Sequence, residues 1–269
     1  MKERDVMRSE QSRELRIEHL TSSEIAEAIA AGAHTAILPL GAIEQHGPHL
    51  PLSMDSDHAD ALALRIARKL GAALVLPTVR VGYSPHHLGF CGSLSVRPST
   101  LEAICLDYCS SLAAHGFARV VLFSGHIGNY PIMRDFEPRL AAALAPALQV
   151  IVYGDSAAIL DAWRKSAQSV AGLGSHVGGH ADVAETSVML VLHPEKVRPD
   201  RAAAGYLGTV DEEFLRRAFV EGVDAVSPNG VLGDPAGSSK VIGHAALDAV
   251  TDLVVEYATA HGARAACHT

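Results

Sequence analysis

The sequence is poor in aromatic residues and lacks long apolar runs, and each shortage excludes a class of protein. Only one tryptophan occurs among the 269 residues, and aromatic side chains make up 5% of the chain. No stretch reaches the roughly 18 to 20 consecutive apolar residues that a membrane-spanning helix requires, so we expect no membrane span. Residues 1–20 alternate in charge and lack the apolar segment of a secretory signal, which favours a cytoplasmic location.

Positive charge and cysteine are also scarce. The 22 lysines and arginines face 30 aspartates and glutamates, for a formal net charge of −8. Nucleic acid is not expected as a partner, because its recognition needs clustered basic side chains. The four cysteines form no CxxC pair, and Cys105 and Cys109 share one face of an expected helix with apolar neighbours. We therefore expect the cysteines to be reduced thiols of the core.

The apolar residues and the histidines are abundant. Apolar residues make up 48% of the chain and charged residues 19%, so the chain can bury enough surface to fold. No repeat, low-complexity tract or linker divides it, which indicates one domain over residues 1–269 with a polar leader at 1–20. The 15 histidines are an unusual excess. Because imidazole is the commonest protein metal ligand, they direct attention to metal binding.

Strand patterns alternate with helical patterns along the chain. The apolar runs at 35–40 and 119–124 are typical of strands buried on both faces, and shorter strands are expected at 73–76 and 148–153. Helices are expected at 21–31, 57–70, 99–115, 131–144, 156–165, 181–192 and 238–260, with capping boxes at 21–24 and 99–102. This alternation predicts an α/β fold whose mainly parallel sheet is covered on both faces. Ligands bind at the carboxyl ends of such strands, which selects the loops after 35–40 and 119–124.

The loop after the first apolar run carries seven potential metal ligands between residues 44 and 58. Glu44 and His46 are two residues apart, so in an extended segment they project to the same side. Asp55, at the start of the next helix, can add a carboxylate that bridges two ions, and such mixed ligation suits Zn²⁺ or Mn²⁺. The alternative is that Asp55 or Asp57 caps the helix and the histidines are solvated.

Two later segments offer further ligands. His126 lies between glycines after the second apolar run, where the backbone permits a close approach to a ligand. His180 and Glu185 are five residues apart, but His180 lies on a glycine-rich entry and is not bound to helical spacing. Glu185 stands among small and apolar residues, so its carboxylate needs a partner. A metal ion would supply that partner, and a salt bridge to an arginine is the alternative.

These segments resemble the signature of the creatininase (creatinine amidohydrolase) family. The shared motifs are GAIEQHGPHLPL at 41–52, GHIGN at 125–129, HADVAETS at 180–187 and GVLGDP at 230–235. The resemblance implies a three-layer α/β/α sandwich that holds two divalent ions, usually zinc or manganese, and hydrolyses a non-peptide or unusual C–N bond of a small molecule. It also implies a homo-oligomer, typically a hexamer.

The resemblance assigns roles to individual residues. Glu44, His46, Asp55 and His126 match the family's metal ligands, with Asp55 as the bridge. In creatininase itself a glutamate follows the loop histidine by two residues, where this chain has Gly128. The role of fifth ligand therefore falls to Glu185, which is similar to relatives that have glycine there. His180 is then a polar catalytic or substrate-binding residue.

The substrate is less well defined by the resemblance. Creatininase has a tryptophan where this chain has His176, and the only tryptophan here is Trp163, which argues against an aromatic clamp. Relatives act on formamides, on the C-terminus of a redox-peptide precursor and on a cyclic keto-inositol. Candidate substrate-binding residues are Tyr83, His87, His176 and Asn129. The alternatives are solvent exposure for the 82–92 loop, which holds the first two, and orientation of His126 or of a turn for Asn129.

Three functional hypotheses follow. In the first, the chain is a binuclear metal-dependent amidohydrolase, whose ions lower the pKa of a bound water and polarise a carbonyl. His180 then passes a proton to the leaving nitrogen. The second is a metal-dependent lactone or ring-opening hydrolase, or an isomerase of a cyclic polyol or keto-inositol. The third is a non-catalytic metal-binding scaffold.

Overall fold

The computed structural model describes residues 13–262, and a parallel β-sheet forms its centre. The strand order is β2-β1-β3-β4, all parallel. The strands are β1 (Thr35–Leu40), β2 (Ala73–Val75), β3 (Arg119–Ser124) and β4 (Gln149–Val152). The two expected apolar runs, β1 and β3, are paired in register over their whole length, so they end at the same edge of the sheet. A separate antiparallel pair is formed by β5 (Val177–His180) and β6 (Leu232–Gly233).

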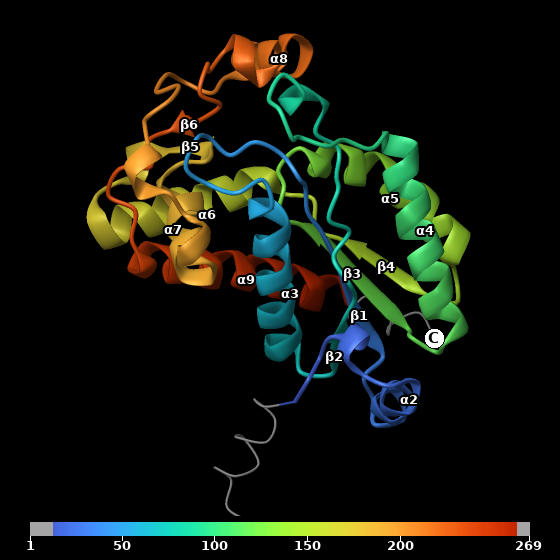
Figure 1. Cartoon of the computed structure of the whole chain (residues 1–269). Helices are drawn as coiled ribbons and strands as arrows, with labels where there is room; N and C mark the ends of the chain where they lie inside the picture. The colour runs from blue at the N-terminus through green and yellow to red at the C-terminus, as the bar shows by residue number, and fades with distance from the viewer. Residues whose placement is uncertain (1–12, 263–269) are drawn as a thin grey trace, which may run out of the picture.

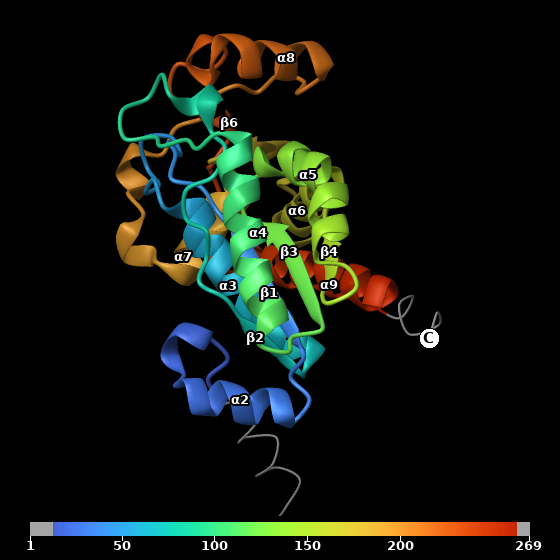
Figure 2. The ribbon, with the colours of Figure 1, turned by 90° about the vertical axis from the view of Figure 1, so that its right-hand side faces the viewer.

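Helices cover both faces of the central sheet. The α-helices of residues 13–262, including α2 and α8 at the two ends of the molecule, are α2 (Ser22–Ala30), α3 (Met54–Leu70), α4 (Pro98–Ala114), α5 (Asn129–Leu144), α6 (Ser156–Ala171), α7 (Val183–Leu192), α8 (Glu212–Glu221) and α9 (Lys240–Gly262). Short 3-10 helices are η1 (Ile17–His19), η2 (Pro85–His87), η3 (Gly174–His176), η4 (Pro194–Lys196), η5 (Pro199–Arg201) and η6 (Val223–Ala225). Figures 1 and 2 show α4 and α5 on one side of the sheet and α3 and α9 on the other. The predicted three-layer α/β/α sandwich is confirmed.

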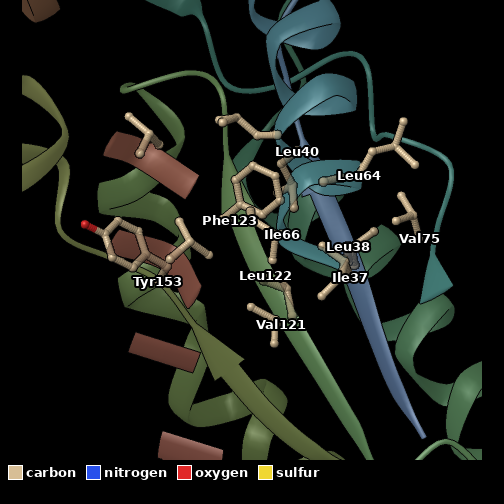
Figure 3. Packing of buried hydrophobic residues seen from close by; sticks show 14 of the residues in the cluster. Ile37, Leu38, Leu40, Leu64, Ile66, Val75, Val121, Leu122, Phe123 and Tyr153 are labelled. Atoms are coloured by element: carbon tan, nitrogen blue, oxygen red, sulfur yellow. The ribbon is translucent and has the colours of Figure 1, made fainter. Parts of the chain in front are cut away.

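The core lies on both faces of the two central strands. Ile37 and Leu38 on β1, and Val121 and Leu122 on β3, are fully buried although successive side chains point to opposite faces (Figure 3). A strand covered on both faces has no solvent-facing positions, which is why its sequence is a continuous apolar run. The sheet is therefore a rigid base for the loops at its carboxyl edge.

Several details differ from the expectations. The capping box at Thr21 and Glu24 is present, but α4 starts on Pro98 after Arg97 without a side-chain cap, because proline is itself suited to the first turn. The elements α8, β5 and β6 were not expected. Part of the expected polar leader packs on the sheet, since Leu15 is buried and its carbonyl accepts a hydrogen bond from the Val75 amide.

The structure tests two expectations from the sequence, that the cysteines are core thiols and that no helix spans a membrane. Cys105 and Cys109 are buried free thiols, as expected, whereas Cys91 is exposed, so the expectation of a core thiol is wrong there. Cys267 and residues 1–12 lie outside the described residues. Within residues 13–262, no helix combines the length and the apolarity needed to cross a membrane.

Candidate metal centre

The site forms where β1 and β3 end beside the first turn of α3. A Cβ atom at Gly125, directly after β3, would lie 2.3 Å from the Asp55 carbonyl oxygen, so only glycine lets α3 pack this close. The N-cap of α3 is Ser53, and Asp55 lies inside the first turn. The capping alternative for Asp55 and Asp57 is wrong, because Asp57 instead pairs with Arg80 and Lys196.

The five predicted metal ligands come together in one buried cluster. The Nε2 atom of His46 lies 3.2 Å from Asp55 Oδ1 and 3.7 Å from Glu185 Oε2. The Nδ1 atom of His126 lies 3.2 Å from Asp55 Oδ2 and 3.3 Å from Glu44 Oε1. Each of the five is at most 4% exposed. Asp55 therefore stands between the two histidines with one oxygen toward each, the position that a bridging carboxylate requires.

Backbone carbonyls fix the orientation of both imidazoles. His46 Nδ1 lies 3.1 Å from the Glu44 carbonyl oxygen, and His126 Nε2 lies 3.1 Å from the Tyr83 carbonyl oxygen. When these nitrogens donate to the carbonyls, the other nitrogen of each ring presents its lone pair to the carboxylates. Metal-ligating histidines commonly have this arrangement, with the second ring N–H held by a backbone oxygen or a carboxylate.

Several carboxylate oxygens of the cluster have no hydrogen bond. Both oxygens of Glu44 and Oδ2 of Asp55 are buried and unpartnered, although histidine nitrogens lie within 3.3 Å of Glu44 Oε1 and of Asp55 Oδ2. Buried carboxylates are strongly disfavoured unless a positive charge or hydrogen-bond donors compensate them. Carboxylate oxygens and imidazole nitrogens that lie this close without forming hydrogen bonds are arranged as donors to a shared cation. The residues thus fit divalent cations.

The pKa shifts also show that the cluster demands positive charge. Burial alone would lower the pKa of His46, but Asp55, Glu185 and Glu44 raise it to about 10. Burial acts in the same direction on His126, and Glu44 and Asp55 raise its pKa well above the usual value. Burial raises the pKa of Glu185 to about 8, although His46 opposes the change. Protons or metal ions can supply the required charge.

Glu185 is held at the start of α7. Asp182 caps this helix by accepting hydrogen bonds from the amides of Ala184 and Glu185. Ala181 has a φ of +53°, a conformation rarely adopted by residues other than glycine, and its amide donates to the Glu185 carboxylate. Within residues 13–262 the only ion-pair contact of Glu185 is His46, so the alternative of an arginine partner is wrong.

Sequence reasoning missed the role of Gln45, which links two further histidines to the site. Its side-chain nitrogen lies 2.9 Å from His87 Nδ1 and 3.0 Å from the Gly230 carbonyl oxygen, and its backbone carbonyl lies 2.7 Å from His180 Nε2. With these bonds made, His87 Nε2 faces Glu44 at 3.2 Å and His180 Nδ1 faces it at 3.8 Å. The only sequence signal for Gln45 is its place between two ligands.

A cavity of about 260 Å³ lies over the cluster. Its polar lining includes Glu44, Asp55, His126, His180 and Glu185. Its apolar lining comes largely from α8 and the adjoining segments and includes Leu160, Val210, Phe214, Ala218, Phe219, Val223 and Leu232. Figures 1 and 2 show α8 at the end of the molecule opposite α2. The cavity therefore combines a charged floor with an apolar wall.

The structure differs from the expectations for most of the predicted substrate-binding residues. His87 lines the cavity and is buried, so the alternative of solvent exposure is wrong. Tyr83 and Asn129 are not among the residues that line it, and His176 lies instead beside the Ala236 carbonyl and Asp234. Trp163 is buried against His58, away from the cavity lining.

Asn129 joins three segments of the site rather than facing the cavity. Its side-chain oxygen accepts from the Tyr83 amide at 2.9 Å, and its nitrogen donates to the Gly41 carbonyl and to Ser124 Oγ, each at 3.0 Å. Ser124 Oγ also accepts from the His126 amide at 2.9 Å. The structure thus favours the alternative that Asn129 orients the backbone that carries His126.

We expect Asn129→Ala to lower the free energy of unfolding by about 3 kcal/mol, because it removes three hydrogen bonds and leaves the Tyr83 amide and the Gly41 carbonyl without a partner. Urea unfolding of the metal-free protein measures this change. Ser110→Ala, which removes a single exposed hydrogen bond from the hydroxyl to the Leu106 carbonyl on α4, is the control and should cost about 1 kcal/mol or less. A loss below about 0.5 kcal/mol for Asn129→Ala would show that the three contacts do not hold the loops together.

A parallel α/β sandwich with a buried carboxylate and imidazole cluster at the carboxyl edge of its sheet defines a class, the metal-dependent hydrolases. The family model described as "Creatininase: Creatinine amidohydrolase" matches residues 18–258. The chain belongs to the creatininase family. It is a metal-dependent amidohydrolase, with the donor groups of a metal site gathered under a cavity.

Relatives and solved structures agree with this assignment. The chain is 36% identical over 217 residues to the mycofactocin precursor peptide peptidase of Mycobacterium ulcerans (strain Agy99), which covers 77% of each chain. It is 32% identical over 205 residues to the creatinine amidohydrolase of Pseudomonas putida, which covers 71% of this chain and 76% of the relative. A crystal structure of creatinine amidohydrolase (creatininase) superposes with a TM-score of 0.77 at 26% identity, over 93% of this chain and 98% of that one. Other solved creatininases are described as Zn-Zn type and as Mn.

Proposed function

We propose that this chain uses two divalent ions, zinc or manganese, to hydrolyse an amide C–N bond. The observation that carries the proposal is the placement of Asp55, with one oxygen toward His46 and the other toward His126. Glu44 extends the His126 side and Glu185 the His46 side, so the donors divide into two sets that share Asp55. Bound ions would supply Lewis acidity that activates water and polarises the amide carbonyl.

The chain's own residues orient the reaction. His46 and His126 keep their lone pairs toward the cluster because backbone carbonyls hold their other nitrogens. His180 is fixed in the same way, with Nε2 on the Gln45 carbonyl and Nδ1 toward the cluster, and it lines the cavity. From this position His180 is placed to carry a proton to the leaving nitrogen. The apolar wall excludes bulk water from the reacting groups.

We propose a small amide with an apolar group beside the scissile bond as the substrate class. The cavity of about 260 Å³ admits a compact group, and the wall from α8 matches apolar surface. No tryptophan lines the cavity, which disfavours a flat heterocycle held between indoles. Creatinine amidohydrolase and the mycofactocin precursor peptidase both open amide-type bonds by name, and one creatininase structure is a complex with creatine.

A second candidate substrate is the end of a peptide. The relatives with the higher identities, at 36% and 34%, are mycofactocin precursor peptide peptidases. The wall residues Val210, Phe214 and Phe219 are suited to an apolar side chain of such a peptide. An assay panel of creatinine, formamides, lactams and peptides with apolar termini separates the candidates. Turnover of none of these by the metal-loaded enzyme would contradict the amidohydrolase proposal.

We expect His180→Ala to retain two ions per chain while kcat falls by about 10²- to 10⁴-fold, because proton transfer to the leaving group is lost. Metal content and turnover are measured on the same preparation, since the His180 ring also packs on His46 at a centroid distance of 4.3 Å. His34→Ala, an exposed histidine at the foot of β1, is the control and should behave as the parent. Unchanged turnover in metal-loaded His180→Ala would remove His180 from the mechanism.

Assembly and location complete the proposal. We propose a homohexamer, as is typical of the family, and a cytoplasmic location. The two buried free thiols, Cys105 and Cys109, are consistent with a reducing compartment. Light scattering of the purified protein tests the assembly, and a mass close to that of a single 28.3 kDa chain would contradict it.

A further inference from the structure

Gly128 has no side chain, and the His86 imidazole occupies the space beside His126 that a side chain at position 128 would take. A Cβ atom at Gly128 would lie 2.3 Å from His126 Nε2 and 3.0 Å from His86 Cε1. The backbone at Gly128 is ordinary helical backbone, so the restriction is one of space and not of conformation. The imidazole of His86, carried by η2, thus stands where a side chain at position 128 would enter.

His86 is held rigidly, yet one of its polar atoms has no partner. The side chain is buried, with 7% of the residue exposed. Its ring stacks parallel to that of His126, with centroids 5.9 Å apart and 11° between the planes, and the rings of His87 and of Phe219 on α8 each lie 4.4 Å away. His86 Nδ1 is buried without a hydrogen bond. A buried, unpartnered imidazole nitrogen requires an explanation, because its desolvation costs free energy that no hydrogen bond offsets.

The His86 ring also lies close to two of the predicted metal ligands. One nitrogen of His86, one carboxylate oxygen of Glu44 and one nitrogen of His126 lie within 4.8 Å of one another. Donors about 2.0 to 2.2 Å from one zinc ion lie about 3.3 to 3.6 Å apart in tetrahedral geometry, so side-chain shifts of roughly 1 Å would let all three bind one ion. The three side chains come from different segments, and all three line the cavity.

We infer that His86 is a further metal ligand in this chain, on the ion that Glu44 and His126 would hold. This inference rests on the proposed function. His86 would complete that ion's donor set with a neutral nitrogen where a side chain at 128 would otherwise reach, and Glu185 would serve the ion on the His46 side. An imidazole donor favours zinc over manganese at that position. Because Phe219 packs on His86, the position of α8 would determine where the His86 imidazole lies relative to the ion.

The test compares metal affinity between variants of the full-length protein. His86→Phe keeps a ring between His126 and Phe219 but removes both nitrogens, and His86→Glu restores a donor. His34→Ala controls for zinc adsorbed to surface histidines. Each protein is stripped with a chelator and titrated with Zn²⁺ against a chromophoric competitor, and the Co²⁺-loaded forms are compared by visible absorption.

We expect His86→Phe to bind one ion as the parent does and the other about 10- to 100-fold more weakly, with altered Co²⁺ bands. His86→Glu should recover most of the lost affinity. Parent-like titration and spectra for His86→Phe would overturn the inference, and so would equal weakening in His86→Phe and His86→Glu, which indicates a packing role. A parent protein that binds no zinc would instead overturn the proposed function itself.

Discussion

Stripping the metal from this protein is expected to lower its melting temperature by about 10 to 20 °C. The side chains of Glu44, Asp55 and Glu185 come together only in the folded chain, so ions that bind them stabilise the folded state and not the unfolded one. Two sites, each at about 100 times its dissociation constant, contribute about 5 kcal/mol, and each kcal/mol shifts the midpoint of a chain of this size by roughly 2 to 4 °C. Differential scanning calorimetry with and without chelator measures the shift.

Re-addition of zinc or manganese should restore the midpoint, whereas magnesium should restore less because imidazole donors suit it poorly. The effect should also depend on pH. The pKa of His46 is raised to about 10 in the metal-free site, so at pH 7 an ion must displace its proton. Metal stabilisation should therefore grow as the pH rises from 6 to 8. A midpoint that moves by less than about 2 °C on stripping would contradict a metal site in the cluster.

Asp55→Asn is expected to abolish binding of at least one ion and to lower kcat/KM by 10³-fold or more. Among residues 13–262, Asp55 is the side chain with one oxygen toward His46 and the other toward His126. An amide cannot bridge two cations in this way, because only one of its two terminal atoms is an acceptor. The kinetic effect is large because the reacting groups would no longer be held in position and the charge of the transition state would be less stabilised. Turnover and metal content of the purified variant measure it.

The matched control is Asp57→Asn, two residues further along the first turn of α3. Asp57 pairs with Arg80 and Lys196 and is not among the clustered donor groups. This variant should keep both ions and most of its activity, with a modest loss of stability. If Asp55→Asn kept two ions and turnover within tenfold of the parent, Asp55 would not be the bridge.

The sequence sufficed to predict the sheet and to predict that the candidate ligands near it would lie together. β1 and β3 are buried on both faces, so their sequences had to be continuous apolar runs, and parallel pairing brings their ends to one edge. Glu44 and His46 follow one strand and His126 the other, so their meeting follows from topology. Glu185 was found because an isolated carboxylate among apolar residues needs a cation.

The cavity wall and the substrate contacts could not be predicted in this way. β5 and β6 are too short to show a periodic pattern. α8 is a short amphipathic helix, and its sequence does not tell which part of the protein its apolar side covers. The directions of Tyr83 and Asn129 depend on a network that joins residues 41, 83, 124 and 129. Similarly, His86 and Gly128 are far apart in the sequence and come together only in the fold, so their residue spacing could not predict the contact.

The most direct test of the account is the metal content of the purified protein after equilibrium dialysis against zinc or manganese, measured by mass spectrometry of the elements. We expect about two ions per chain in the parent protein and a loss of at least one in Asp55→Asn, with Asp57→Asn unchanged. A folded parent protein that retains no zinc or manganese after this dialysis would contradict the claim that Glu44, His46, Asp55, His126 and Glu185 form a two-ion site.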